Sequence, residues 1–155
     1  MDQKLTGPDE AWRTRLVETR TDTARILVCV RRIAVIGIKP EHIGGPAFEV
    51  PARLQRAGYT VIPVPVYHPQ VTSILGEPVH RSLTTVEHPI DMALIFRRSA
   101  DVPKHLDELL AVRPRVVWMQ LGIRHDAVAE TLARAGIEVV QDRCAKIELE
   151  HRPTL

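Results

Sequence analysis

The sequence has little cysteine and no long apolar run. Its 155 residues include two cysteines, Cys29 and Cys144, too few for the disulfide framework of a small secreted domain. No segment has the length and apolar character of a membrane span, and the polar N-terminus lacks the apolar core of a signal peptide. We therefore expect a cytoplasmic protein that does not insert into a membrane.

A strong excess of one charge is also absent. The net charge is +2 and the pI is about 8.7, and no dense run of lysine and arginine indicates nucleic acid binding. None of the seven histidines forms an H-x-x-x-H pair, and no C-x-x-C occurs. Neither a nucleophile elbow nor a suitable pair of carboxylates is present. We expect no nucleic acid partner, no metal site and no catalytic residues.

Short apolar runs alternate with amphipathic stretches along most of the chain. The runs are rich in β-branched residues and are typical of strands buried on both faces of a parallel sheet. The amphipathic stretches between them predict helices, two of which end at a glycine. The predicted strands are Arg32–Ile36, Thr60–Val66, Met92–Phe96, Val116–Leu121 and Glu138–Val140, and the predicted helices are Ala47–Ala57, Pro103–Val112 and Asp126–Ala135.

This alternation predicts a Rossmann-like α/β domain with a doubly wound parallel sheet over residues 31–150. We expect about five strands in the order 3-2-1-4-5, with the first strand central. Residues 1–30 predict a helical extension made of Asp9–Glu18, capped by Asp9, and Thr21–Cys29, capped by Thr21 or Asp22. Residues 151–155 form a tail.

Two stretches within this domain are less regular. Proline at position 51 must lie in the first turn of its helix or kink it, so we expect that helix to begin near Glu49 or Val50. Residues Tyr67–Ile90 show no clear periodicity and are long for a connection. They predict either a short helix near Ser82–Val86 or a segment that lines a site.

The loop after the first predicted strand departs from the dinucleotide-binding fingerprint. Gly37 ends the strand as G-x-G-x-x-G requires, but Gly44 and Gly45 come too late. Glycines let backbone N–H groups approach phosphate oxygens, and a helix N-terminus adds positive potential. The loop predicts phosphate binding, and the alternative is a connection without a ligand.

An acidic residue is missing after the second predicted strand. NAD-binding domains place Asp or Glu there to hold the ribose hydroxyls, but no acid occurs between Tyr59 and Gly76. The absence disfavours NAD and leaves NADP and coenzyme A, each with an extra phosphate on the ribose. Arg97 and Arg98, after the third strand, could bind phosphate, or they are solvated loop charges.

Four segments in this order, AVIGIKP, FRRSADVP, VVWMQLGIR and VVQDRCAKIE, with LQRAGYTVIPV between the first two, resemble one family. They are similar to the small stand-alone CoA-binding proteins and to the CoA-binding domain of the succinyl-CoA synthetase α subunit. The resemblance covers about Arg31 to Glu150. It implies a Rossmann-like fold that binds coenzyme A, and stand-alone members of the family have no established catalytic activity.

The resemblance also implies a set of cofactor-binding residues. They form, in order, the phosphate loop, the adenosine side, the nucleotide and pyrophosphate contacts, and the path of the pantetheine arm. These residues are Gly37, Ile38, Lys39, Gly45 and Pro46; Val64, Pro65, Val66 and Tyr67; Phe96, Arg97 and Arg98; and Gln120, Leu121, Gly122 and Ile123.

Two departures from the family pattern fall within this set. Val64-Pro65-Val66 stands where common members read Val-Asn-Pro, so an asparagine that could bind the ribose is absent. The first loop carries Glu41–Gly45 where many members have a stretch rich in serine and arginine. The contacts to adenosine and phosphate are therefore expected to differ from the common pattern.

The leading function on this basis is a non-catalytic carrier, sensor or regulatory protein that binds coenzyme A or an acyl-CoA. One alternative is an NADP-linked oxidoreductase, or a CoA-transferase or synthetase fragment that needs a partner chain. Another is a protein-interaction module that has lost its nucleotide. A homodimer or an unknown protein partner is compatible with each. Cys144, flanked by Arg143 and Lys146, is either a reactive thiol near the CoA thiol or a small packing residue.

Overall fold

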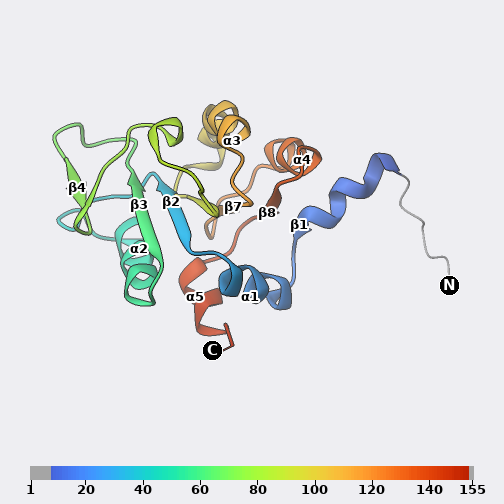
Figure 1. Cartoon of the computed structure of the whole chain (residues 1–155), viewed down its shortest axis with the longest axis horizontal. Coiled ribbons are helices and arrows are strands. Elements are labelled where there is room, and N and C mark those ends of the chain that lie inside the picture. Colours follow the sequence, from blue (N-terminus) through green and yellow to red (C-terminus); the bar gives the residue numbers. More distant parts are fainter. Residues whose placement is uncertain (1–7, 154–155) are drawn as a thin grey trace.

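The computed structural model describes residues 8–153, which form one six-stranded sheet between two layers of helices (Figure 1). All neighbouring strands in this sheet are parallel, in the order β1-β8-β7-β6-β2-β3. This confirms the predicted Rossmann-like α/β class. The strands are β1 Leu16–Val17, β2 Arg32–Ile36, β3 Thr60–Val64, β6 Met92–Ile95, β7 Val116–Met119 and β8 Glu138–Val140.

The predicted strand order 3-2-1-4-5 is wrong. The third predicted strand, β6, lies between β2 and β7, so the five predicted strands run 2-1-3-4-5. Proline supplies the physical reason, because Pro63 in β3 has no N–H for a second neighbour and suits an edge strand. With β3 at the edge, the loops after β2 and β6 become neighbours at the point where the chain reverses direction across the sheet.

Helices cover both faces of this sheet. One face packs against α1 (Arg20–Cys29), α2 (Pro46–Arg56) and α5 (Ala145–Glu150), and the other packs against α3 (Leu106–Val112) and α4 (Asp126–Arg134). Successive residues of β2 alternate between the two cores: Ile33 and Val35 join the first, Ala34 and Ile36 the second. The nearly continuous apolar runs of the strands follow from this double burial.

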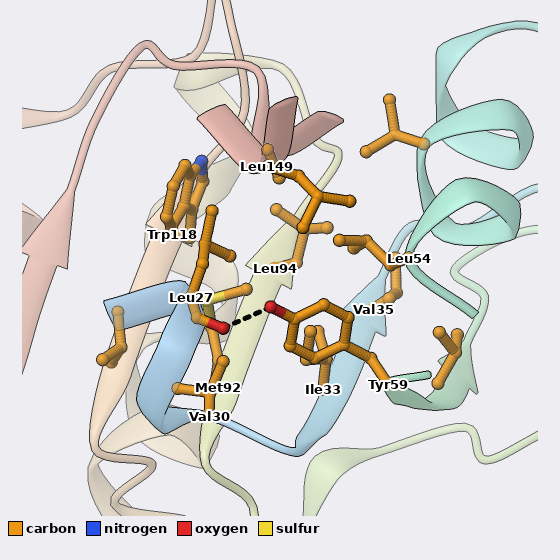
Figure 2. Packing of buried hydrophobic residues seen from close by; sticks show 14 of the residues in the cluster. Leu27, Val30, Ile33, Val35, Leu54, Tyr59, Met92, Leu94, Trp118 and Leu149 are labelled. Atoms are coloured by element: carbon orange, nitrogen blue, oxygen red, sulfur yellow. Dashed lines mark hydrogen bonds between the residues drawn. The ribbon is translucent and has the colours of Figure 1, made fainter. Parts of the chain in front are cut away.

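Two buried polar groups tie the first face together (Figure 2). The hydroxyl of Tyr59 donates to the carbonyl of Leu27 in α1, and burial raises the pKa of this phenol against the opposing effect of Arg152. The indole nitrogen of Trp118 in β7 donates to the carbonyl of Arg143 over 2.8 Å. These bonds satisfy the polar ends of two large aromatic side chains within the core.

The N-terminal segment differs from its prediction. A 3₁₀ helix, η1 (Pro8–Arg15), is followed by the short strand β1, which pairs with β8. The helix expected at Asp9–Glu18 is therefore shorter and of another type. The N-cap of α1 is Thr19, whose hydroxyl accepts from the N–H of Asp22 over 3.2 Å. Residues 1–7 and 154–155 lie outside the described residues.

The segment between β3 and β6 is ordered by its own contacts. It contains a hairpin, β4 (Ser73–Ile74) with β5 (Glu77–Pro78), and a 3₁₀ turn, η2 (Leu83–Thr85), where a short helix was predicted. The guanidinium of Arg81 donates to the carbonyls of Tyr67, His68 and Val71. These bonds hold the beginning of the segment, which carries Tyr67, close to the hairpin.

The remaining element bounds change in small ways. The predicted helix Pro103–Val112 is a 3₁₀ helix, η3 (Ser99–His105), followed by α3. The strands β3, β6 and β7 end one or two residues before their predicted ends, and α5 was not predicted. Within residues 8–153, the structure contains no helix long and apolar enough to cross a membrane.

The helix α2 begins at Pro46, so the start predicted at Glu49 or Val50 is wrong. Pro51 therefore lies inside the helix and cannot donate to the carbonyl of Ala47, four residues earlier. That carbonyl instead accepts from the backbone N–H of Lys39 over 3.1 Å. The internal proline thus leaves a hydrogen-bond acceptor that fastens the loop after β2 (residues 37–45, here the glycine loop) to the helix.

Candidate functional site

Gly37 brings the loops after β2 and β6 into contact. Its N–H donates to the carbonyl of Val64 over 2.9 Å, and the N–H of Phe96 donates to the carbonyl of Ile36 over 2.8 Å. Its φ is +82°, and a Cβ built there would lie 2.1 Å from the carbonyl oxygen of Phe96. Only glycine fits this position without moving the loop after β6.

The N-terminus of α2 faces this junction with two backbone donors. Gly45 is the N-cap and has no side chain to bind the helix N–H groups, and Pro46 contributes no N–H. Within the described chain, the N–H groups of Gly45 and Ala47 have no hydrogen-bond partner. A helix N-terminus with free N–H groups favours an anion.

A cavity of about 540 Å³ lies at this end of the sheet. It collects residues from the loops after β2, β3, β6 and β7, as expected for the carboxyl edge of a parallel sheet. Nine residues of the predicted cofactor-binding set line it, namely Gly37, Lys39, Gly45, Pro46, Tyr67, Phe96, Arg97, Arg98 and Ile123.

Positive charge dominates the cavity. Lys39, Arg97 and Arg98 line it together with one acid, Asp101. The Asp101 carboxylate accepts from the ammonium of Lys104 over 2.9 Å and from Arg98 Nε over 3.0 Å. These bonds lower the pKa of Asp101 to about 2, so the acid stays ionised. Asp101 therefore holds Arg98 in place and offsets only part of the positive charge.

Arg97 is held by neutral groups. Its Nε donates to Nε2 of His105 over 3.1 Å, and its Nη1 donates to the hydroxyl of Tyr67 over 3.2 Å. Because Nε2 accepts, the imidazole proton is on Nδ1, which lies 2.7 Å from Oε1 of Glu108. The other carboxylate oxygen of Glu108 accepts from the N–H of Leu83 over 3.0 Å. This chain of bonds orients Arg97 without neutralising it by direct pairing.

Seven predicted site residues do not line this cavity. Ile38, Val64 and Pro65 are buried, and Val66 is half-buried. Gln120 is buried, and its side-chain oxygen accepts from the N–H of Ala145 over 3.1 Å. The N–H of Gly122 donates to Asp142 over 2.7 Å, and Leu121 lines a second cavity. Their proposed contacts with a cofactor stay predictions.

Sequence reasoning missed two lining residues, Ala47 and Asp101, and two supporting ones, His105 and Glu108. Gly44 also lines the cavity; it was named in the predicted phosphate-binding loop but was not in the cofactor-binding set. The spacing of Arg98, Asp101 and Lys104, three residues apart, could have indicated their ion pairs on one helical face. His105 carried no comparable signal, because its partner Arg97 reaches it only through the fold. Residues 8–153 contain no group of three His, Cys, Asp or Glu side chains that could hold a metal ion.

Comparison with known proteins identifies the family of this chain. Residues 31–150 match the family described as "CoA binding domain". The chain belongs to the CoA-binding domain family. The uncharacterized protein YneT of Bacillus subtilis is 31% identical over 131 residues, which are 83% of this chain and 93% of YneT.

Solved structures show the same fold. A protein from Thermus thermophilus is 35% identical, with a TM-score of 0.78 over 86% of this chain and 98% of its own. A hypothetical protein from Pyrococcus horikoshii is 25% identical, with a TM-score of 0.78 over 86% of this chain and 92% of its own. The CoA-binding family and its Rossmann-like fold thus span most of the chain.

Proposed function

We propose that this member of the CoA-binding family binds coenzyme A, free or as a thioester, and acts as a carrier, sensor or regulatory protein without its own catalysis. The observation that carries the proposal is the cavity beside β2 and β6. Lys39, Arg97 and Arg98 meet there at a glycine junction, next to the free N–H groups of Gly45 and Ala47. Coenzyme A carries three phosphate groups, and a positive cavity of this kind suits them.

The phosphates divide between two sets of donors. The N-terminus of α2 and Lys39 suit the pyrophosphate, since backbone N–H groups and helix potential act together there. Arg97 and Arg98 suit the phosphate on the ribose. The loop after β3 has no acid that would repel that phosphate, and it presents the exposed ring of Tyr67 at the cavity.

A parallel titration tests the proposal. Isothermal calorimetry on ligand-free protein is run with coenzyme A, dephospho-CoA, adenosine 3′,5′-bisphosphate, NADP and NAD. We expect coenzyme A to bind, dephospho-CoA to bind about tenfold or more weakly, and NAD not to bind, because charge-assisted hydrogen bonds to the ribose phosphate contribute about 1.5–3 kcal/mol. Binding of NADP alone, or of none of the five, would refute the proposal.

A further inference from the structure

A second cavity, of about 470 Å³, lies at the carboxyl ends of β8 and β1. The N-terminal segment contributes Leu16, Val17 and Arg20 to its wall, and the α5 region contributes Cys144 and Ile147. Residues 16–20 precede the segment that matches the family. The cavity is thus built between the family domain and a segment outside it.

The loop after β7 contributes residues to both cavities. Ile123 lines the cavity beside β2 and β6, whereas Leu121 and Arg124 line the second cavity. Both cavities therefore lie along the same edge of the sheet and share one short loop. A ligand that extended from the first cavity along this loop would reach the second one.

The lining of the second cavity suits an uncharged, partly apolar group. It carries three arginines and three acids, so its formal charge balances, unlike that of the first cavity. The side chains of Leu121 and Ile147 are 60% and 45% exposed, although both are large and apolar. Together with Ile43 and Tyr67 they are the exposed large apolar side chains of the described chain. Exposed apolar side chains at a cavity indicate a binding surface.

Part of the cavity wall is charged. Glu148 is buried, and its carboxylate accepts from Arg143 over 2.9 Å, from Thr23 over 2.9 Å and from Arg20 over 3.3 Å. Burial raises the pKa of Glu148, but these hydrogen bonds and the two arginine charges outweigh it and leave the pKa below its usual value. An apolar chain packed against these charged groups would shield them further from water at a cost. The apolar part of a ligand is therefore short.

We propose that the second cavity binds the acyl end of a short-chain acyl-CoA, with the N-terminal segment as one wall. This inference rests on the proposed function, because the nucleotide must occupy the cavity beside β2 and β6. The second cavity would make the protein bind thioesters with short chains more tightly than free coenzyme A. The pantetheine arm then passes along the loop of Leu121 and Ile123.

Calorimetry with an acyl series tests this inference. Coenzyme A, acetyl-CoA, butyryl-CoA and octanoyl-CoA are compared, with adenosine 3′,5′-bisphosphate as the nucleotide half alone. We expect affinity to rise about fourfold for each methylene from acetyl to butyryl and to stop rising before octanoyl. Equal affinities for coenzyme A, acetyl-CoA and butyryl-CoA, or a rise that continues to octanoyl, would overturn it. If neither coenzyme A nor the nucleotide half binds, the proposed function itself fails.

Two isoleucines give a matched pair of variants. Ile147→Ser changes the second cavity, and Ile43→Ser changes a side chain with nearly the same exposure, 47%, that lines neither cavity. Ile147→Ser should abolish the gain from acetyl to butyryl and leave the affinity for the nucleotide half unchanged. Ile43→Ser should keep the gain. The reverse pattern, or equal behaviour of the two variants, contradicts the assignment.

The two free thiols can report whether the second cavity is occupied, in the protein without substitutions. Cys144 lies at the second cavity, whereas the exposed Cys29 lies outside both cavities. Saturating butyryl-CoA should slow alkylation of Cys144 by iodoacetamide and leave Cys29 unaffected, as measured by peptide mass spectrometry. The nucleotide half should slow neither. Unchanged alkylation of Cys144 with butyryl-CoA bound would overturn the inference.

Discussion

The two ends of the same sheet edge carry arginines in different surroundings. Beside β2 and β6, Arg97 is held by Tyr67 and a neutral His105, and no acid among residues 8–153 pairs with it directly. Beside β8 and β1, Arg143 and Arg20 both bind the buried carboxylate of Glu148. One end keeps its positive charge and the other neutralises it. What an edge of this fold can bind therefore depends on the partners of its charges as well as on its shape.

Gly37→Ala should give the largest effect, because it acts on the end beside β2 and β6 through the backbone. The added Cβ would meet the carbonyl of Phe96 at 2.1 Å, and φ of +82° strains any side chain. We expect a loss of several kcal/mol in the free energy of unfolding and loss of coenzyme A binding. Urea unfolding and calorimetry measure both.

Gly58→Ala is the control for this variant. Its φ is +103°, but a Cβ there has no atom within 4 Å, so it should cost only about 1–2 kcal/mol and preserve binding. Equal effects of the two variants would mean that the contact with Phe96 is unimportant.

Glu148→Gln should break the charge balance at the other end. Removing the acid leaves Arg143 and Arg20 without their common partner, and the amide cannot accept from all three donors. We expect a loss of about 2 kcal/mol, less than for a fully buried pair because Arg20 is half-exposed. Urea unfolding measures it. Unchanged stability would show that the network contributes nothing.

Arg97→Gln should weaken coenzyme A binding by about tenfold to a hundredfold, since a charge-assisted hydrogen bond contributes about 1.5–3 kcal/mol. Stability should change little, because Arg97 lies in a loop and is only half-buried. Arg115→Gln, an exposed arginine at the opposite end of β7, is the control and should bind normally. If both variants bind coenzyme A with the same affinity, the positive charge of Arg97 does not contribute to binding.

His105→Ala should have a smaller effect in the same direction. It removes the acceptor that fixes Nε of Arg97 and leaves the charge in place. We expect coenzyme A affinity to fall by a few-fold, measured by calorimetry. His105→Asn, which keeps an acceptor, should recover part of the loss. A fall as large as that of Arg97→Gln would mean that His105 contacts the ligand itself.

The pH dependence of stability should reflect Asp101. Its pKa falls from 3.8 in the unfolded chain to about 2 in the folded protein, because Lys104 and Arg98 bind its ionised form. A lowered pKa gives stability that is present above about pH 4 and is lost as the pH falls toward 2. Asp101→Asn should flatten the stability curve in this window, as measured by urea unfolding at each pH. An unaltered curve would contradict the ion pairs.

The sequence predicts the strands well because both faces of each strand are buried, and the apolar runs record this. The sequence does not readily reveal the order of the strands in the sheet, although Pro63 indicated an edge strand. The strand β1 has only two residues and forms through β8, far along the chain. Local pattern cannot predict such an element.

The two cavities were predictable to different degrees. Nine of the sixteen predicted site residues line the cavity beside β2 and β6, because strand ends and glycines mark its loops. The second cavity needs residues 16–20 to meet residues 139–148, and no motif signals that contact. His105 and Glu108 were missed for the same reason, since they reach Arg97 only in the folded chain.

The proline inside α2 links stability to function. Because Pro51 lacks an N–H, the carbonyl of Ala47 is available to Lys39. Pro51→Ala would supply a competing donor for that carbonyl and a better helix former, so the helix would gain stability while the glycine loop lost an anchor. A substitution that stabilises the helix would then weaken the backbone contact that holds the anion site. Pro51, which does not line the cavity, would set how rigidly that site is held.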